Sequence, residues 1–180
     1  MKVICISGKA QHGKDTSAGF LSSILSANDN RVLTAHYGDL VKYICTTFFN
    51  WNGVKDENGR TLLQYVGTDK IRKKNPDYWV DFIEDILSFF PDEWDYVLIP
   101  DCRFPNEVDY LKSCGHDVIH LRVVRENFVS PLTPEQQNHP SETALDNVTP
   151  DAWIFNNGTL EDLENYIKAL CDKITGEVAV

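Results

Sequence analysis

The chain has 180 residues and a mass of 20.5 kDa, which is the size of a single domain. It carries 17 Lys and Arg against 27 Asp and Glu, and the net charge of −10 disfavours general attraction to a nucleic acid polymer or to a membrane surface. Any anion that it binds must therefore be held in a local pocket. Its five scattered cysteines include no Cys-x-x-Cys pair, which argues against a zinc cluster and favours a reducing compartment. The N-terminal apolar run of four residues is too short for a signal peptide, so we expect a cytoplasmic protein.

The N-terminal part of the chain is predicted to alternate between strands and helices. Apolar, β-branched runs indicate strands, and apolar residues at helical spacing indicate helices. The predicted elements are a strand over 2–7, a helix over 14–27, a strand over 31–37 and a helix over 39–49. The last of these helices is predicted to present Leu40, Ile44 and Phe48 on one face.

Two further helices are predicted in the middle of the chain, after a polar loop over 50–60. The capping-box pattern Thr61-Leu-Leu-Gln64 is predicted to open the first, and Asn75-Pro76 the second, with proline at the first helical position. The second helix carries a broad apolar face made of Trp79, Phe82, Ile83, Ile86 and Phe90. This helical pair interrupts the alternation of strands and helices, so we expect it to protrude as a subdomain.

The remainder of the chain returns to alternation. Its predicted elements are a strand over 95–100, a helix over 105–113, strands over 117–124 and 152–156, and a helix capped by Thr159-Leu-Glu-Asp162. The final helix has an apolar stripe of Leu160, Leu163, Ile167, Leu170 and Ile174. The segment 126–150 is long, proline-containing and without periodicity, which is typical of a functional or mobile loop. The whole pattern predicts an α/β fold with a parallel sheet covered on both faces.

A glycine-containing segment stands between the first predicted strand and the first predicted helix. It reads GKAQHGKDT over residues 8–16, and Gly8, Gly13 and Lys14 match the P-loop spacing G-x-x-x-x-G-K. Glycines let the backbone wrap closely around a phosphate, and the following helix adds the positive end of its dipole. Lys14 is then predicted to reach the β- and γ-phosphates of a nucleotide. The alternative is a glycine turn with an exposed lysine, which the strand before and the helix after disfavour.

Two acidic residues and an arginine extend this hypothesis. Asp15 stands where a P-loop normally has Ser or Thr, so it is predicted to take part in Mg²⁺ binding, directly or through water; alternatively, it only charges the helix N-terminus favourably. Asp101 follows an apolar strand, in the place of a Walker-B carboxylate. Arg103 is predicted to lie near the transferred phosphoryl group, with an ion pair to Glu107 as the alternative.

Several motifs together carry a family resemblance that covers residues 1–173. They are GKAQHGKDT (8–16), YGDLVK (37–42), LLQYVGTDKIRKKNPDYWV (62–80), PDCRFPNE (100–107), HPSE (139–142) and IFNNGTLEDL (154–163). In their order and combination they resemble the bacteriophage-type deoxynucleoside monophosphate kinases of the P-loop nucleoside monophosphate kinase superfamily. The resemblance implies a three-layer P-loop kinase fold with a five-stranded parallel sheet, a helical acceptor-binding insert and a lid. It also implies transfer of the ATP γ-phosphoryl group to a dNMP, giving dNDP and ADP, in the host cytoplasm if the source is viral.

The same resemblance divides the single domain of residues 1–180 and assigns its site. The core is expected over about 1–49, 91–125 and 151–175, the insert over about 50–90 and the lid over about 126–150. The expected catalytic set is Lys14, Asp101, Arg103 and Arg125. Residues expected to bind ATP are Gly8, Lys9, Ala10, Gln11, His12, Gly13, Lys14, Asp15, Thr16, Arg122, Asn157 and Gly158. Residues expected to bind the acceptor nucleotide are Asp39, Lys42, Gln64, Thr68, Arg72, Trp79 and Arg103, with Arg72 on its phosphate and Asp15 and Asp101 on Mg²⁺.

The supply of cations in the lid departs from the pattern of many monophosphate kinases. No Lys or Arg occurs between Arg125 and Lys168, so Arg122 and Arg125 are the cations at the lid's base. Glu142 is predicted to order the lid by pairing with one of them, and His139 is expected to be exposed. Four cations in five positions, at Lys70, Arg72, Lys73 and Lys74, offer a local anchor for a monophosphate or a solvated helix end.

Other functions remain open at this point. A P-loop kinase could instead act on another small acceptor or on a polynucleotide 5′-end, although the acidic net charge disfavours the latter. A non-catalytic nucleotide-binding switch is the third reading. We expect small-molecule nucleotide partners and leave open a homodimer.

Overall fold

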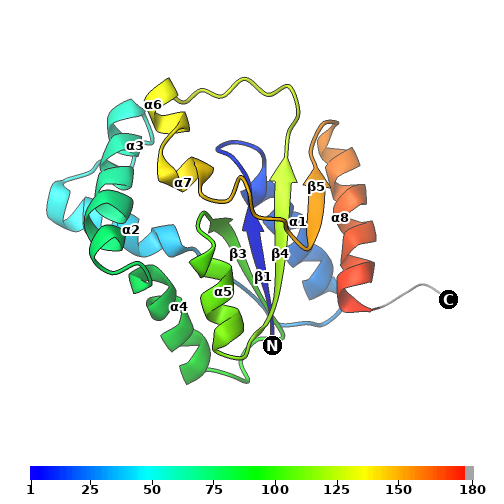
Figure 1. Ribbon diagram of the computed structural model, residues 1–180. Coiled ribbons are helices and arrows are strands. Elements are labelled where there is room, and N and C mark those ends of the chain that lie inside the picture. The colour runs from blue at the N-terminus through cyan, green and yellow to red at the C-terminus, as the bar shows by residue number, and fades with distance from the viewer. Residues whose placement is uncertain (177–180) are drawn as a thin grey trace.

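The computed structural model describes residues 1–176, and the last four residues of the predicted domain lie outside them. Five parallel strands form one sheet in the order β2-β3-β1-β4-β5 (Figure 1). The strands are β1 (Lys2–Ser7), β2 (Val32–Thr34), β3 (Tyr96–Cys102), β4 (Asp117–Val124) and β5 (Ala152–Phe155). All five were predicted, although β2 is shorter than the expected 31–37. The predicted α/β fold with a five-stranded parallel sheet is therefore confirmed.

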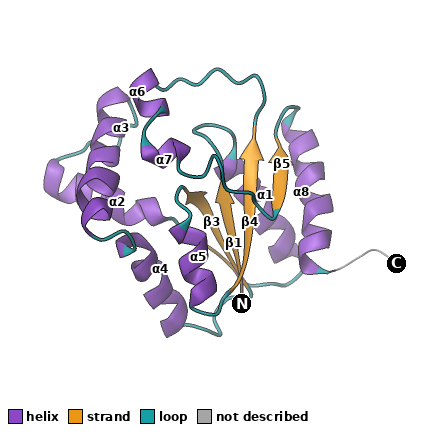
Figure 2. Cartoon of the chain, viewed as in Figure 1, coloured by secondary structure: helices purple, strands orange, loops and turns teal. Residues whose placement is uncertain are grey.

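Helices cover both faces of the sheet and make the molecule three layers thick (Figure 2). On one face, α1 (Lys14–Ala27) and α8 (Leu160–Thr175) pack on apolar residues of the central strands, among them Ile4, Ile6 and Leu121. On the other face, α2 (Tyr37–Phe49), α4 (Tyr78–Phe89) and α5 (Asn106–Ser113) enclose a second cluster. The strands bury side chains on both faces, which explains why their sequences are nearly continuous apolar runs.

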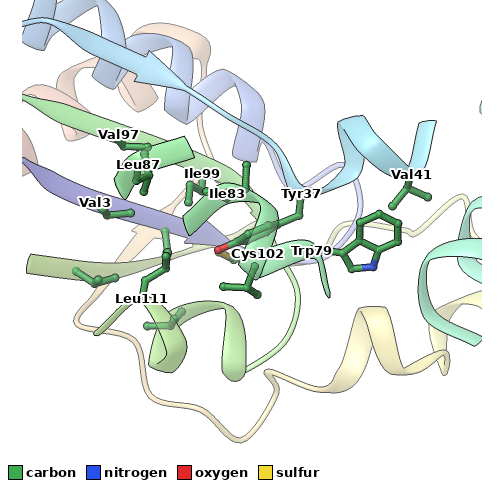
Figure 3. Close-up of a cluster of buried hydrophobic side chains, with 14 of the residues drawn as sticks. Val3, Tyr37, Val41, Trp79, Ile83, Leu87, Val97, Ile99, Cys102 and Leu111 are labelled. Atoms are coloured by element: carbon green, nitrogen blue, oxygen red, sulfur yellow. The ribbon is translucent and has the colours of Figure 1, made fainter. Parts of the chain in front are cut away.

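Figure 3 shows the second cluster of buried apolar side chains. Val3, Val97 and Ile99 from the sheet meet Leu111 of α5 and Ile83 of α4. At the opposite end of this cluster lies Trp79 of α4, which is buried and donates its indole N–H to the carbonyl of Gly67 at 3.0 Å. The apolar core therefore extends directly to one wall of the cavity described below.

The turn between β1 and α1 can form only because residue 8 is glycine. Gly8 has φ +144°, and a Cβ atom there would lie 2.4 Å from the carbonyl oxygen of Val123 at the end of β4. Gly13, at the N-cap of α1, has φ +102°. The two glycines thus let the turn lie against the carboxyl edge of the sheet, as the P-loop motif predicted.

The middle of the chain differs from the prediction in where its helices begin. The helix α3 (Glu57–Gln64) begins four residues before the predicted start at Thr61, because Asp56 caps it by accepting the amide of Gly59 at 2.8 Å. Likewise α4 begins at Tyr78, not at Asn75-Pro76, since the Asn75 side chain accepts the amide of Asp77 and holds a turn before the helix. Between them lies an unpredicted π-helix, η1 (Tyr65–Arg72).

Several predicted helix faces are also wrong in part. In α2 the buried residues are Tyr37, Val41 and Cys45, whereas Phe48 is 69% exposed. The helix begins at Tyr37 rather than at Asp39, and the face that packs on the sheet is the one that carries this tyrosine. The predicted face residues Phe82, Phe90 and Leu160 are likewise exposed, while Val80 and Leu87 of α4 are buried.

The segment 126–150 is not structureless. It contains two short helices, α6 (Pro134–Gln137) and α7 (Pro140–Thr143), each with proline at its start. After β4 the chain crosses over to α3, where α6 lies, and returns through α7 towards the sheet (Figure 1). Within residues 1–176, no helix is long and apolar enough to cross a membrane.

Candidate active site

A cavity of about 370 Å³ opens at the carboxyl ends of β1 and β3. In parallel α/β sheets this edge is where ligands bind. Its walls come from the turn at 8–16, the N-terminus of α2, the α3–η1 segment, the start of α5 and the segment 126–150. Residues distant in sequence thus share one space that is large enough for a small-molecule ligand.

Lys14 is folded back into the turn that carries it. Its ammonium donates to the carbonyls of Gly8 at 2.7 Å and Lys9 at 2.9 Å, and the residue is 7% exposed. Burial, and then the nearby charge of Arg103, lower the pKa of Lys14 to about 8. The site therefore holds a lysine whose charged form would gain from an anionic ligand.

Asp101 joins the end of β3 to the start of α2. Its carboxylate accepts the amides of Tyr37 at 3.0 Å and Gly38 at 2.8 Å, and so caps a helix whose own N-cap side chain, His36, makes no capping bond. Asp15, which also lines the cavity, has a side chain that is 83% exposed, with the His36 imidazole 3.6 Å away. Hydrogen bonding to Asp15 raises the pKa of His36.

Arg103 contacts Glu107 only through its backbone amide, so the predicted ion pair between its side chain and Glu107 is wrong. Its guanidinium donates to the Ser141 carbonyl at 3.1 Å and to the Glu142 carboxylate. Glu142 also accepts the backbone amide of Ala10 at 3.0 Å, inside the P-loop turn. The expected pairing of Glu142 with Arg122 or Arg125 is therefore corrected, because Glu142 reaches the turn and Arg103 instead.

Arg122 and Arg125 lie outside the cavity lining. Arg122 is buried and donates to the Leu145 carbonyl and, at 2.8 Å, to Asp146, so it anchors the end of the segment 126–150. Arg125 lies with its guanidinium over the Phe128 ring at 5.0 Å. Its backbone amide donates to His12 at 3.1 Å, which places this residue on the outer side of the turn.

Arg72 is buried in an ion pair rather than free in the cavity. It donates to the Glu107 carboxylate, to the Pro76 carbonyl at 3.0 Å and to Asn106 at 3.1 Å, with Phe104 stacked at 4.0 Å. Burial raises the pKa of Glu107 to about 7, although Arg72 opposes the shift. The pair lines the cavity and ties η1 to the start of α5.

The segment 126–150 bridges the cavity from the turn to the helical segment. Gln136 donates to the Glu57 carbonyl at 3.3 Å and to Thr61 at 3.4 Å. His139 was expected to be exposed, but it is half-buried, accepts the Ser141 amide at 3.2 Å and lies 3.5 Å from Asp69. The segment thus covers one side of the cavity.

Part of the predicted site is gathered in the cavity lining, and part is not. The predicted residues that line it are Ala10, Gln11, Lys14, Asp15, Lys42, Gln64, Thr68, Arg72, Trp79, Asp101 and Arg103. Those outside the lining are Gly8, Lys9, His12, Gly13, Thr16, Asp39, Arg122, Arg125, Asn157 and Gly158. Of these, Asp39 pairs with Lys42 at 2.6 Å, and Asn157 bonds to Glu126 through both its amide atoms at 2.8 Å.

Two lining cations, Lys55 and Arg60, were missed by the sequence analysis. Neither side chain has a carboxylate partner among the residues that the structure describes. Desolvation and the charges of Lys42 and Arg60 lower the pKa of Lys55. Arg60 could have been predicted if the helix had been started at Glu57. Arg60 and Gln64 are then four residues apart in one helix and share a face.

Solved structures that share the fold include two kinases of small molecules. A sugar kinase from a Janibacter species superposes with a TM-score of 0.57 at 15% identity, covering 96% of this chain and 95% of its own. Shikimate kinase from Aquifex aeolicus gives 0.52 at 16% identity, covering 97% of each chain. At these identities the likeness concerns the fold alone, and it defines the class: a P-loop kinase fold.

Sequence comparison gives the family within that class. The sequence profile of the family described as deoxynucleotide monophosphate kinase matches residues 34–167, and the chain belongs to this family. The deoxynucleotide monophosphate kinase of Enterobacteria phage T4 is 36% identical over 121 residues, covering 65% of this chain and 47% of its own length. That of Escherichia phage RB69 is 30% identical over 113 residues, covering 62% and 43%. The chain thus spans about half the length of these two curated relatives. A protein of Acanthamoeba polyphaga mimivirus aligns at 26% identity over 96% of this chain and 97% of its own length.

Replacing Arg72 tests the buried ion pair. Arg72→Ala leaves the Glu107 carboxylate buried without its cation, which is expected to lower the free energy of unfolding by about 3–5 kcal/mol. Urea unfolding measures the loss. Lys73→Ala, an exposed neighbour, is the control and should change stability by less than about 0.5 kcal/mol.

A second change checks the reason for that loss. Adding Glu107→Gln to Arg72→Ala removes the uncompensated charge while keeping acceptors for the amides of Arg103 and Phe104, so part of the stability should return. No recovery in the double variant would contradict the ion-pair explanation.

Proposed function

We propose that this protein is a deoxynucleoside monophosphate kinase, which transfers the γ-phosphoryl group of ATP to a dNMP and releases dNDP and ADP. The observation that carries the proposal is that one cavity holds both a P-loop turn with a buried Lys14 and a second wall with cations and a tryptophan. One wall suits the phosphates of the donor, and the other suits an acceptor nucleotide. Family membership supports this choice of substrates.

The donor phosphates are proposed to lie along the turn at 8–16. An anion fits there, because the amide of Ala10 already donates to a carboxylate and Lys14 lies beside it. The adenine end is proposed to lie on the outer side of the turn, where Arg125, Asn157 and Gly158 follow the ends of β4 and β5. Arg122 is proposed to anchor the lid rather than to touch ATP, since it is buried against residues 145 and 146.

The acceptor is proposed to lie between α2 and the α3–η1 segment. Gln64 and Thr68 face the cavity from one helical face, and Trp79 closes its apolar end. Arg72 can reach the acceptor phosphate only by leaving Glu107. We therefore assign that phosphate first to Lys55 and Arg60, whose charges the described residues leave without a carboxylate partner.

Asp15 and Asp101 are the residues that would hold Mg²⁺. Their carboxylates both line the cavity near Lys14, and oxygen ligands of this kind are the ones that Mg²⁺ prefers. The metal, when bound, supplies charge neutralisation at the donor phosphates. Asp101 also keeps the N-terminus of α2 in place through its two amide bonds.

The chemistry needs no protein base, because the attacking phosphate oxygen of the acceptor is already ionised near neutral pH. The protein's own contribution is to align donor and acceptor, to exclude water under the segment 126–150, and to stabilise charge through Lys14 and Arg103. Release of ADP should therefore depend on an acceptor. A panel of dNMPs, NMPs and non-nucleotide acceptors in a coupled ADP assay tests this directly. ADP release without any acceptor would favour a nucleotide-binding switch. ADP release that occurs only with a non-nucleotide acceptor would favour a P-loop kinase of another small molecule.

Lys14→Ala is expected to lower kcat for the preferred dNMP by several hundredfold or more, because it removes the cation that bridges the donor phosphates. The same coupled assay gives the value. Lys168→Ala, an exposed lysine on α8, is the control and should leave kcat unchanged. Full activity of Lys14→Ala would contradict the proposed role of the turn at 8–16 in phosphoryl transfer.

Arg60→Ala is expected to raise KM for the dNMP by tenfold or more and to leave KM for ATP within twofold, because Arg60 is assigned to the acceptor side. Steady-state kinetics with each substrate varied in turn separate the two constants. Lys73→Ala, an exposed cation of the same insert, serves as the matched control. An equal rise in both constants would place Arg60 outside the acceptor site.

Proton uptake tests the state of Lys14. With a pKa of about 8 in the free protein, Lys14 is partly neutral at pH 8, and bound phosphates favour its charged form. ATP binding should therefore take up protons at pH 8 and almost none through Lys14 at pH 6.5, and ATP affinity should fall as the pH rises above 8. Calorimetry in buffers of different ionisation enthalpy measures the uptake. If Lys14→Ala takes up as many protons on ATP binding as the wild type, the uptake belongs to another group.

A further inference from the structure

Glu142 lies where the site is built to hold an anion. Its side chain is 6% exposed and comes from the segment 126–150, yet its carboxylate is inside the P-loop turn. One oxygen accepts the amide of Ala10 at 3.0 Å, and the other pairs with Arg103. The negative charge of Glu142 also favours the charged form of Lys14, whose ammonium bonds to the carbonyls of Gly8 and Lys9 in the same turn.

The segment around Glu142 is fastened to the same turn by further bonds. The Lys9 ammonium donates to the Glu142 carbonyl at 2.6 Å and to Asp146 at 2.7 Å. Arg103 donates to the carbonyl of Ser141 at 3.1 Å, and Arg122 holds Asp146 from the sheet side. The position of Glu142 is thus fixed by bonds on both sides of it in sequence, and its contact with Ala10 is part of a docked segment.

A carboxylate and a phosphate oxygen compete for the same surroundings. Both are anions, and both accept bonds from backbone amides, arginine and lysine. Two such anions cannot lie within a few ångströms of each other at low solvent exposure without strong repulsion. The Ala10 amide and Arg103 can therefore serve either Glu142 or a phosphate of the donor at one time.

We infer that Glu142 is a positioning residue that occupies the place of a donor phosphate in the free protein, and that the donor must displace it. This inference rests on the proposed function, and it names a device that regulates the same site. While the site is free of nucleotide, Glu142 keeps the Ala10 amide in bonding geometry and gives the half-buried Arg103 a carboxylate partner. Once displaced, it releases Arg103 to the phosphates.

Competition between Glu142 and the donor phosphates lowers the affinity of the protein for the donor. If binding requires Glu142 to leave, the measured dissociation constant is the intrinsic one divided by the fraction of molecules in which it has left. Removing the carboxylate removes this competing state, so phosphate binding should become tighter. A residue that only supported the fold, or that bound the donor itself, would give the opposite effect.

The test compares the full chain with Glu142→Gln and Glu142→Ala by calorimetric titration with ATP and, separately, with pyrophosphate. Both variants are expected to lower the dissociation constant for each ligand by threefold or more. The matched control is Glu135→Gln, which neutralises an exposed acid of the same segment and should leave both constants unchanged. Melting temperatures establish that each variant is folded. If one of the two variants does not fold, the other still tests the inference.

Steady-state kinetics add a readout that a structural role would not give. KM for ATP should fall in Glu142→Gln while kcat changes by less than threefold. A fall in kcat with unchanged ATP binding would mean that Glu142 holds Arg103 during transfer, which overturns the inference.

The other outcomes separate the two proposals. If the wild type and both variants bind ATP with the same dissociation constant, the role of Glu142 falls and the proposed function stands. Weaker binding in folded variants overturns the inference in the same way. If none of the proteins binds ATP or pyrophosphate, both the proposed function and the role of Glu142 fall.

Discussion

The contact between Gly8 and the end of β4 is the constraint on which the site depends. Since a side chain at this position would collide with the Val123 carbonyl, only glycine lets the turn lie directly on the sheet edge. The turn leads into α1, which begins at Lys14, and the Lys14 side chain folds back onto the carbonyls of Gly8 and Lys9. The amide of Ala10 lies in this turn, where the donor phosphates are proposed to bind.

Around this turn, charge is balanced by the protein's own acids. Arg103 forms an ion pair with Glu142, Arg72 with Glu107 and Lys9 with Asp146. The Asp101 carboxylate accepts hydrogen bonds from backbone amides of α2. An anionic substrate can therefore bind in two ways. It can meet Lys55 and Arg60, two cavity-lining cations without a carboxylate partner among the described residues, or it can replace an acid. The assignment of acceptor to the first and donor to the second follows from this difference.

The sequence predicted the five strands, their parallel sheet, the limits of α1 and the P-loop, because each rests on a local pattern or a spacing. It failed where partners come from elsewhere in the chain. The start of α3 depends on Asp56 as cap, and the face of α2 depends on packing against β3 and α4. The pairing of Arg103 with Glu142 joins residues 39 positions apart, so no local spacing could favour it over Glu107. The same holds for Arg72, whose partner lies 35 positions away.

The turn at 8–16 is proposed to hold the phosphates of a nucleotide, and Glu142 is proposed to give up its place to them. A crystal structure with a non-hydrolysable ATP analogue tests both proposals most directly. We expect the triphosphate to lie along this turn, bonded to the Ala10 amide and Lys14, with the Glu142 carboxylate withdrawn from both the turn and Arg103. An analogue bound elsewhere, or bound in the turn with Glu142 unmoved, would contradict this expectation.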